Sequence, residues 1–268
     1  MLRLILSVLL VISLTAAAQS EPTNDEQFVT TNEWHFGIAA GVGVATNPLN
    51  GGDDFPLVLL PDVHYYGERV FFDNGRLGYT LTQTDSVAVS VISEFNPENR
   101  FFVFWHPSNI FMRSNAFTEF PITIDQVEKR KWALDAGIDV SYFHENIWLN
   151  FLWFHDISQV YKGDRAKLSL NHLIAFGDVK LSSEAGVWYF SQQLADYYYG
   201  IRESDNWPPY TLDSAFTPYA KLQLSKPIDE SAEWLVSVHY QSYRQLADSP
   251  LFAEDHALSV FMGVKYVF

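Results

Sequence analysis

Apolar and polar residues alternate along most of this chain. Near the C-terminus, Trp234, Val236 and Val238 take every second position, with Leu235 and Ser237 between them. A period of two places successive side chains on opposite faces of a β-strand. Such segments exceed the usual strand of about 5–6 residues and approach the roughly 9–11 residues of a tilted strand that crosses a membrane. The alternating segments are 33–45, 69–81, 86–95, 131–143, 147–157, 165–176, 179–190, 213–225, 231–243 and 256–268.

These segments predict ten strands, and two further turns would make the number twelve. The larger number requires that residues 56–66 form a separate strand that turns at Gly67-Glu68. It also requires a tight turn at Asp73-Asn74-Gly75. Both numbers are even, which keeps the two ends of a transmembrane barrel on the periplasmic side.

Two architectures produce this alternation: a soluble antiparallel barrel with its apolar face inward, and an outer-membrane barrel with its apolar face toward lipid. The second is favoured because short links such as 177–178 alternate with long ones such as 191–212, and because the non-apolar face mixes glycine, small polar and charged residues. Aromatic residues also gather at strand ends, as in interfacial girdles. We predict an all-β, transmembrane, antiparallel, up-and-down β-barrel with short periplasmic turns and long outer loops. The strand-end rings are Trp34, Trp132, Tyr142, Trp234, Tyr240, Tyr266 and Phe268.

The N-terminus predicts export. Residues 1–18 combine Arg3, an apolar stretch and the small residues Ala16-Ala17-Ala18, which is the pattern of a cleaved secretory signal. After residue 18, no apolar run approaches the roughly 18 residues of a membrane helix. We therefore expect a signal peptide over 1–18, a periplasmic tail over 19–32 and an outer-membrane barrel over 33–268.

Composition narrows the chemistry. The formal net charge is −15 and the chain has no cysteine. Without a basic stripe, binding to nucleic acid is not expected. Without cysteine, disulfides, thiolate metal sites and a cysteine nucleophile are excluded.

Several short motifs resemble a known family. The ending Tyr266-Val267-Phe268 resembles the terminal aromatic signature that the outer-membrane assembly machinery recognises, which makes that machinery an expected partner through Phe268. Over most of the expected barrel the chain resembles the MipA/OmpV family, the MltA-interacting proteins. The matching stretches are 61–67, Phe71-Phe72, Gly78-Tyr79, 197–200 and 248–251. The resemblance implies an outer-membrane barrel in contact with the bilayer and lipopolysaccharide. It also implies a scaffold linking a murein-cleaving lytic transglycosylase to a murein synthase.

Two outward-facing histidines, His155 and His172, are candidates for a lipid-face hydrolytic site. Pairing the strands around residues 158–164 sets His155 opposite Leu168 and His172 opposite Phe151, about four rows or roughly 13 Å apart. They cannot share one proton relay. The chain also lacks HExxH, GxSxG and P-loop patterns. We expect no catalytic, cofactor-binding or metal-binding residues and no enzymatic activity.

Three other groups of residues have both a possible functional role and an ordinary structural one. The cluster 197–199 is a ligand platform or, more simply, aromatic packing under an outer loop. Acids of the outer loops could collect cations, but solvated charge is the simpler interpretation. Glycines at 37, 41 and 43 predict close inward packing of the first strand and no phosphate loop. The loop acids are Asp53, Asp54, Asp125, Glu128, Glu203, Asp205, Glu254 and Asp255.

The lumen-facing charges balance. This favours a bridged interior over a selective pore, since open porins need about 16 strands. The predicted function is therefore an envelope scaffold or interaction protein. The alternative is a narrow solute channel, and a lipid-face hydrolase ranks third. The acids Asp135, Asp139, Glu184 and Glu233 are expected to face Lys167, Lys180, Lys221 and Lys265.

Overall fold

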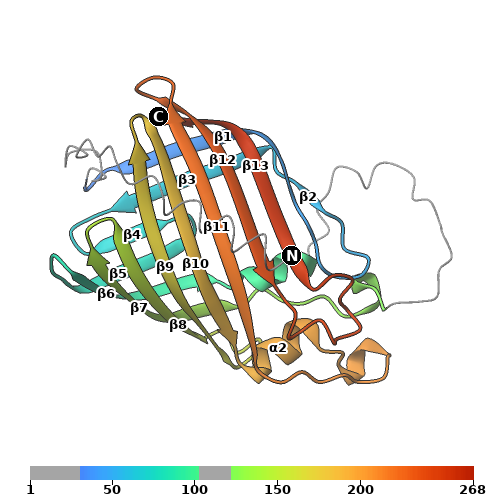
Figure 1. The fold of residues 1–268 in the computed structure, drawn as a ribbon. Helices are drawn as coiled ribbons and strands as arrows, with labels where there is room; N and C mark the ends of the chain where they lie inside the picture. Colours follow the sequence, from blue (N-terminus) through green and yellow to red (C-terminus); the bar gives the residue numbers. More distant parts are fainter. Residues whose placement is uncertain (1–30, 103–121) are drawn as a thin grey trace, which may run out of the picture.

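A computed structural model describes residues 31–102 and 122–268, and they form a closed antiparallel β-barrel (Figure 1). The predicted signal peptide and nearly all of the predicted tail lie outside these residues. The strands are β1 (Trp34–Ala45), β2 (Phe55–Pro56), β3 (Leu59–Tyr66), β4 (Val70–Asp73), β5 (Arg76–Gln83), β6 (Val87–Phe95), β7 (Leu134–His144), β8 (Ile147–Asp156), β9 (Asp164–Phe176), β10 (Val179–Phe190), β11 (Ala215–Pro227), β12 (Ala232–Ser242) and β13 (His256–Val267).

The wall of the barrel has twelve strand positions in the described residues, here called staves. Twelve is the larger of the two predicted numbers. Each strand pairs with the next along the chain, and β13 closes the ring on β1. The elements β2 and β3 both pair with β1 and together form one stave, interrupted at 57–58. The two turns that the higher number requires are present: β3 turns into β4 after Tyr66, and β4 turns into β5 at Asn74 and Gly75.

Closure at β1 and β13 depends on paired glycines. Gly41 lies directly opposite Gly263 across this seam. A Cβ atom on Gly41 would overlap the carbonyl oxygen of Met262 and the Cα atom of Gly263. The glycines of the first strand thus serve close packing of the wall, as predicted.

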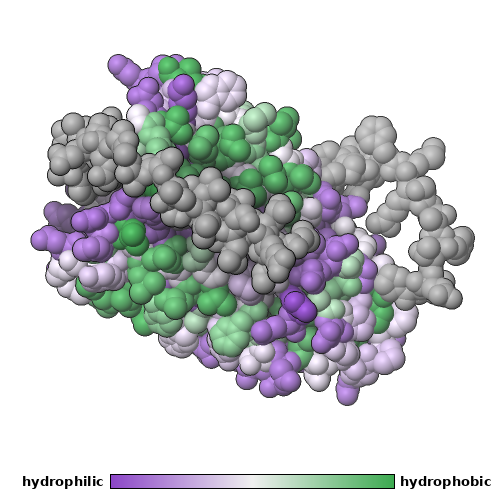
Figure 2. Space-filling view, in the orientation of Figure 1, coloured by the Kyte–Doolittle hydropathy of each residue, from purple (hydrophilic) through white to green (hydrophobic). Residues whose placement is uncertain are grey.

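Apolar side chains cover the outside of the barrel, as predicted for the lipid-facing surface. Val42, Leu170, Leu222 and Met262 are exposed, and Val42 keeps 68% of its surface accessible. Figure 2 shows hydrophobic side chains across the strands and hydrophilic ones toward both ends. Such a band is costly in water and stable against acyl chains. No helix in the described ranges is long and apolar enough to span a bilayer.

The two ends of the barrel differ in their connections. One end has only short turns, at 67–69, 84–86, 145–146, 177–178 and 228–231, and the C-terminus lies there (Figure 1). Gly177 has φ +59°, the left-handed conformation that a two-residue hairpin requires. The opposite end has the long loops 46–54, 96–133, 157–163, 191–214 and 243–255. These loops carry α2 (Gln192–Tyr199) and the 3₁₀ turns η2 (Pro97–Phe102), η4 (Ile124–Gln126) and η5 (Glu203–Asp205).

Candidate functional site

The long loops fold together into a packed cap over one end of the barrel, here called the outer cap. Its core includes Tyr198 and Tyr199 of α2, Phe101 of η2, and Leu246 and Leu251 of the last loop. All of these side chains except Phe101 are 0% exposed, and Phe101 is 3% exposed. Exposed flexible loops do not bury aromatic rings in this way. The outer cap is therefore a small hydrophobic core of its own.

The helix α2 positions the tyrosines of the cap. Ser191 is its N-cap residue, and its side chain accepts a hydrogen bond from the Leu194 amide at 3.4 Å. The same Ser191 oxygen accepts from the Asp164 amide at 3.0 Å, which ties the start of the helix to β9. At the other end the Gly200 amide donates to the Asp196 carbonyl. Residues 197–199 thus lie on a capped helix, with Tyr198 and Tyr199 buried, which confirms the packing interpretation for these two rings.

A buried ion pair fixes the wall of the outer cap. The Arg130 guanidinium lies 3.2 Å from an Asp205 carboxylate oxygen, and both side chains are 0% exposed. Arg130 also donates to the Gly200 carbonyl at 2.8 Å. Asp205 accepts from the amides of Arg202 and Glu128, each at 2.8 Å. Burial alone would raise the pKa of Asp205, but the hydrogen bonds from Arg130 and these amides hold that pKa below its ordinary value.

A second polar contact crosses the cap. Glu98 of η2 is buried, and its carboxylate accepts hydrogen bonds from the hydroxyls of Tyr199 and Tyr243, the latter at 3.4 Å. The pKa of Tyr199 lies well above its ordinary value, first because of burial and then because of the Glu98 charge. Since η2, α2 and the loop after β12 each supply one member, this contact joins three loops over the barrel mouth.

Ion pairs also line one wall of the lumen. Arg165 of β9 is 1% exposed; it contacts Asp135 of β7 at 2.6 Å and Glu94 of β6 at 2.7 Å. Arg76 of β5 contacts the other oxygen of Glu94 at 2.6 Å. These four side chains join four staves of one wall. Sequence reasoning assigned lysines to Asp135 and missed this group, although Arg165 has the same strand parity as the predicted lumen residue Lys167.

Two of the predicted lumen pairs are present. Lys167 contacts Glu184 at 3.0 Å, and Lys265 contacts Glu233 at 3.6 Å. Lys265 lies nearer to Asp62, at 2.7 Å, which the sequence did not single out. Asp139 differs from the prediction, because its described partners are the Asn150 amide and the Ser141 hydroxyl.

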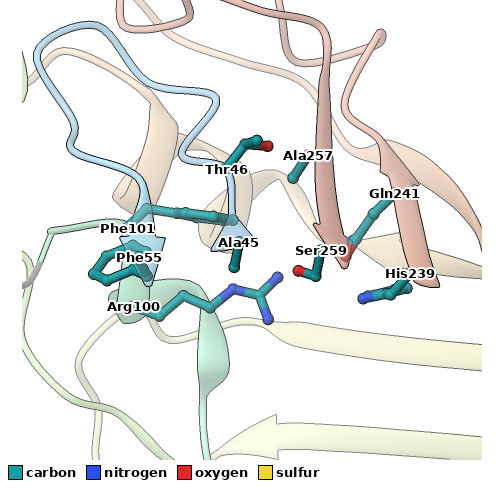
Figure 3. A pocket seen from close by; sticks show the side chains of 9 residues that line it. All are labelled: Ala45, Thr46, Phe55, Arg100, Phe101, His239, Gln241, Ala257 and Ser259. Atoms are coloured by element: carbon teal, nitrogen blue, oxygen red, sulfur yellow. The ribbon is translucent and has the colours of Figure 1, made fainter. Parts of the chain in front are cut away.

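A small cavity lies directly beneath the outer cap. Its volume is about 60 Å³, and its wall comes from β1, β2, β12, β13 and η2. Figure 3 shows the Arg100 guanidinium extending into this space toward Ser259 and His239. Periodicity could not reveal this site, because Arg100 lies in a loop. The lining residues are Ala45, Thr46, Phe55, Arg100, Phe101, His239, Gln241, Ala257 and Ser259.

His155 and His172 lie farther apart than predicted. His155 pairs with Asp164, and His172 pairs with Ile147, so the predicted register of β8 and β9 was wrong by four residues. The loop predicted at 158–164 lies at 157–163, one residue earlier and of the same length. His155 contacts Asp164 at 2.9 Å, whereas His172 Nε2 lies 3.2 Å from the Asn146 side chain. The structure does not bring the two rings together.

The loop acids also remain separate. Asp205 forms an ion pair with Arg130, and Asp54 accepts a hydrogen bond from the Asn47 backbone amide at 3.0 Å. Within residues 31–102 and 122–268, no three acidic or histidine side chains converge in a way that could hold a metal ion.

Comparison with known proteins assigns the family. The family described as MltA-interacting protein MipA matches residues 38–268, which covers all the barrel strands except the start of β1. The chain belongs to the MipA family. YiaT of Escherichia coli (strain K12), whose name places it in the outer membrane, is 24% identical over 238 residues, covering 86% of this chain and 90% of that protein. The MltA-interacting protein of the same strain is 21% identical over 243 residues, covering 88% and 91%.

The chain also aligns with solved structures of transport proteins. An outer membrane channel from Pseudomonas putida F1 aligns with a TM-score of 0.38 and 9% identity, covering 93% of this chain and 100% of the channel. The Pseudomonas putida toluene transporter TodX aligns with a TM-score of 0.37 and 8% identity, covering 89% and 90%. Both scores are low, so what those proteins transport says nothing about this MipA-family chain.

Proposed function

We propose that this MipA-family barrel is a closed, non-enzymatic scaffold of the bacterial envelope that acts through protein contacts. The supporting observation is the outer cap. A solute channel needs a continuous hydrated path, whereas Tyr198, Tyr199 and Tyr243 fill the mouth with completely buried rings. Ion pairs between Arg165, Asp135 and Glu94 further tie the lumen wall together. A barrel built in this way is suited to anchoring and less suited to transport.

The proposed partner is a murein enzyme of the periplasm. A relative 21% identical to this chain carries the name MltA-interacting protein, which supports a lytic transglycosylase as one partner. A murein synthase is the second, on the resemblance described above. A specific interface buries about 800 Å² per partner. The short-turn end supplies surface for it, and residues 19–32 add to that surface if they form the expected tail.

Charge at the short-turn end suggests the chemistry of the contact. Its five turns contain six acids against one base, Arg69. Such a surface favours a basic partner face, and the association should weaken as salt rises. The acids are Glu68, Asp85, Glu145, Asp178, Asp229 and Glu230.

This placement rests on the expected export of the chain. We propose that residues 1–18 are cleaved as a signal peptide and that the barrel is assembled in the outer membrane by recognition of its C-terminal aromatic end. Phe268 is 82% exposed, so its ring is available for such recognition. Outer-leaflet lipopolysaccharide would then surround the end that carries the cap.

Capture of murein enzymes from detergent extracts tests the scaffold proposal. The wild-type barrel, immobilised through an outer loop, is expected to retain a lytic transglycosylase and a murein synthase at low salt. Reversal of three turn acids, Glu68→Lys, Asp85→Lys and Asp229→Lys, should reduce retention at least about tenfold, since like charges would then face each other.

The matched control reverses three acids at the opposite end: Asp53→Lys, Glu203→Lys and Glu254→Lys. It has the same net charge as the turn variant and should retain the partners as the wild type does. Equal loss in both variants would indicate a nonspecific charge effect. Failure of the wild-type barrel to retain any murein enzyme would refute the scaffold proposal.

A further inference from the structure

Arg100 stands out because its exposed guanidinium lines the cavity beneath the outer cap. Its guanidinium carbon lies 4.7 Å from the centroid of the Phe101 ring. Contact of one face with an aromatic ring leaves the N–H groups at the edge of the guanidinium available for hydrogen bonds in its plane. In Figure 3 the end of the Arg100 side chain extends into the cavity beneath the outer cap.

The described residues give Arg100 few acceptors. Arginine has five N–H donors, and the one acceptor found in residues 31–102 and 122–268 is the Tyr243 hydroxyl, at a long 3.4 Å. No carboxylate in these ranges lies within 4.0 Å of the guanidinium. Glu98, two residues earlier, is engaged by the hydroxyls of Tyr199 and Tyr243. The Arg100 side chain is solvent-exposed, so its remaining N–H groups can exchange water for the oxygens of a ligand.

The cavity next to Arg100 has the size and lining of a polar site. A volume of about 60 Å³ exceeds the roughly 10–15 Å³ needed for one water, so it holds several waters or one small anion. Ser259 brings a hydroxyl to its wall and Thr46 another. The His239 ring lies edge-on to Tyr219 at 5.8 Å, and the Gln241 amide donates to Thr217, so both polar side chains are held in place.

The surrounding charges favour an anion. Arg100, Lys167 and Lys221 lie around His239, with Glu184 as the acid among them. If Glu98 is included, three cations face two carboxylates, in a chain whose overall charge is −15. Lys167 is paired with Glu184, and Glu98 is held by tyrosines, so Arg100 is the cation directed at the cavity.

We propose that this cavity binds a small oxyanion, a single carboxylate or phosphate group, between the Arg100 guanidinium and the Ser259 hydroxyl. The guanidinium edge suits two oxygens of such a group, and the hydroxyl donates to one of them. The site is independent of the proposed scaffold role, because it lies beneath the outer cap and away from the short turns.

Titration calorimetry of the purified full-length barrel in detergent tests this proposal. Sodium phosphate and sodium acetate serve as separate probes, each compared with sodium chloride at equal ionic strength. Saturable binding of at least one probe is expected, and the probe that binds identifies the head group. The Arg100→Gln variant should bind at least about tenfold more weakly, because a charge-assisted hydrogen bond is lost. Arg244→Gln, on an exposed outer loop, should match the wild type.

Folding of each variant is checked by its heat-dependent gel mobility. If Arg100→Gln does not fold, Ser259→Val decides: it removes the hydroxyl and narrows the cavity, so severalfold weaker binding supports the site. Absence of saturable binding of both probes to the wild type would overturn the proposal. Wild-type affinity in Arg100→Gln or in Ser259→Val would also overturn it, and equal weakening in Arg244→Gln would show a nonspecific charge effect.

Discussion

At the scale of single residues, the outer cap is defined by polar side chains buried among aromatic ones. Arg130 and Asp205 illustrate why they come in matched sets: a completely buried charge is tolerated only when another group neutralises it and the remaining donors find acceptors. Arg130 meets this condition with Asp205 and the carbonyls of Gly200 and Glu128. Removing one member of such a set is costlier than removing an exposed ion pair.

The first prediction concerns this pair. Arg130→Met keeps much of the side-chain volume but leaves the Asp205 carboxylate buried without its cation. We expect the cap to lose roughly 3–5 kcal/mol of stability while the barrel remains closed. Limited proteolysis with trypsin should therefore cut the outer loops much faster in the variant, whereas the heat-dependent gel mobility of the barrel should not change.

Glu203→Ala is the matched control, because Glu203 lies on the same 3₁₀ turn as Asp205 but is exposed. Its loops should be as resistant as those of the wild type. Wild-type resistance in Arg130→Met would mean that the pair does not hold the cap.

At the scale of elements, strands could be predicted from the sequence and loops could not. Alternation such as that of Trp234, Val236 and Val238 indicates one polar and one apolar face. It therefore predicted the strands and which of their faces points outward. It did not distinguish ten strands from twelve, since β4 has only four residues and carries almost no pattern. The register of β8 and β9 was wrong because it depends on where each strand ends and how the loop joins them, which alternation does not report.

The candidate sites lie where periodicity gives no information. Glu98, Arg100 and Arg130 come from loops. Their hydrogen-bond partners Tyr243 and Gly200 lie 70 or more residues away in the sequence. Such contacts depend on how several loops fold over one another. Arg165 and Glu94, in contrast, lie on strands, and extending the alternation by one or two positions would have placed them in the lumen.

The second prediction concerns the seam between β1 and β13. Gly41→Val would push a branched side chain into the backbone of β13 at Met262 and Gly263. We expect roughly 1–3 kcal/mol of destabilisation or more, and slower closure of the ring, because overpacking against backbone cannot be relieved by rotamer changes. The fraction of heat-modifiable protein after refolding into detergent measures this effect.

Val42→Ala, at the next position on the lipid-facing side, serves as the control. Val42 is largely exposed on that face, so its truncation should leave the folded fraction nearly unchanged. A folded fraction in Gly41→Val equal to that of Val42→Ala would show that the glycine pair is not needed for closure.

At the scale of the whole molecule, the chain is a twelve-stave MipA-family barrel closed at one end by a packed cap and edged at the other by short acidic turns. The two ends therefore suit different tasks. In the proposed function, the short-turn end offers charge for a partner and the capped end restricts passage through the lumen. We propose that the closed mouth prevents conduction.

Single-channel recording in planar bilayers measures whether ions pass through the barrel. After insertion of the purified wild-type barrel, the account predicts a flat current with no discrete steps at moderate voltage, because the rings of Tyr198, Tyr199 and Tyr243 occupy the mouth. Regular, reproducible opening steps that scale with the number of inserted barrels would contradict it and would favour the narrow solute channel.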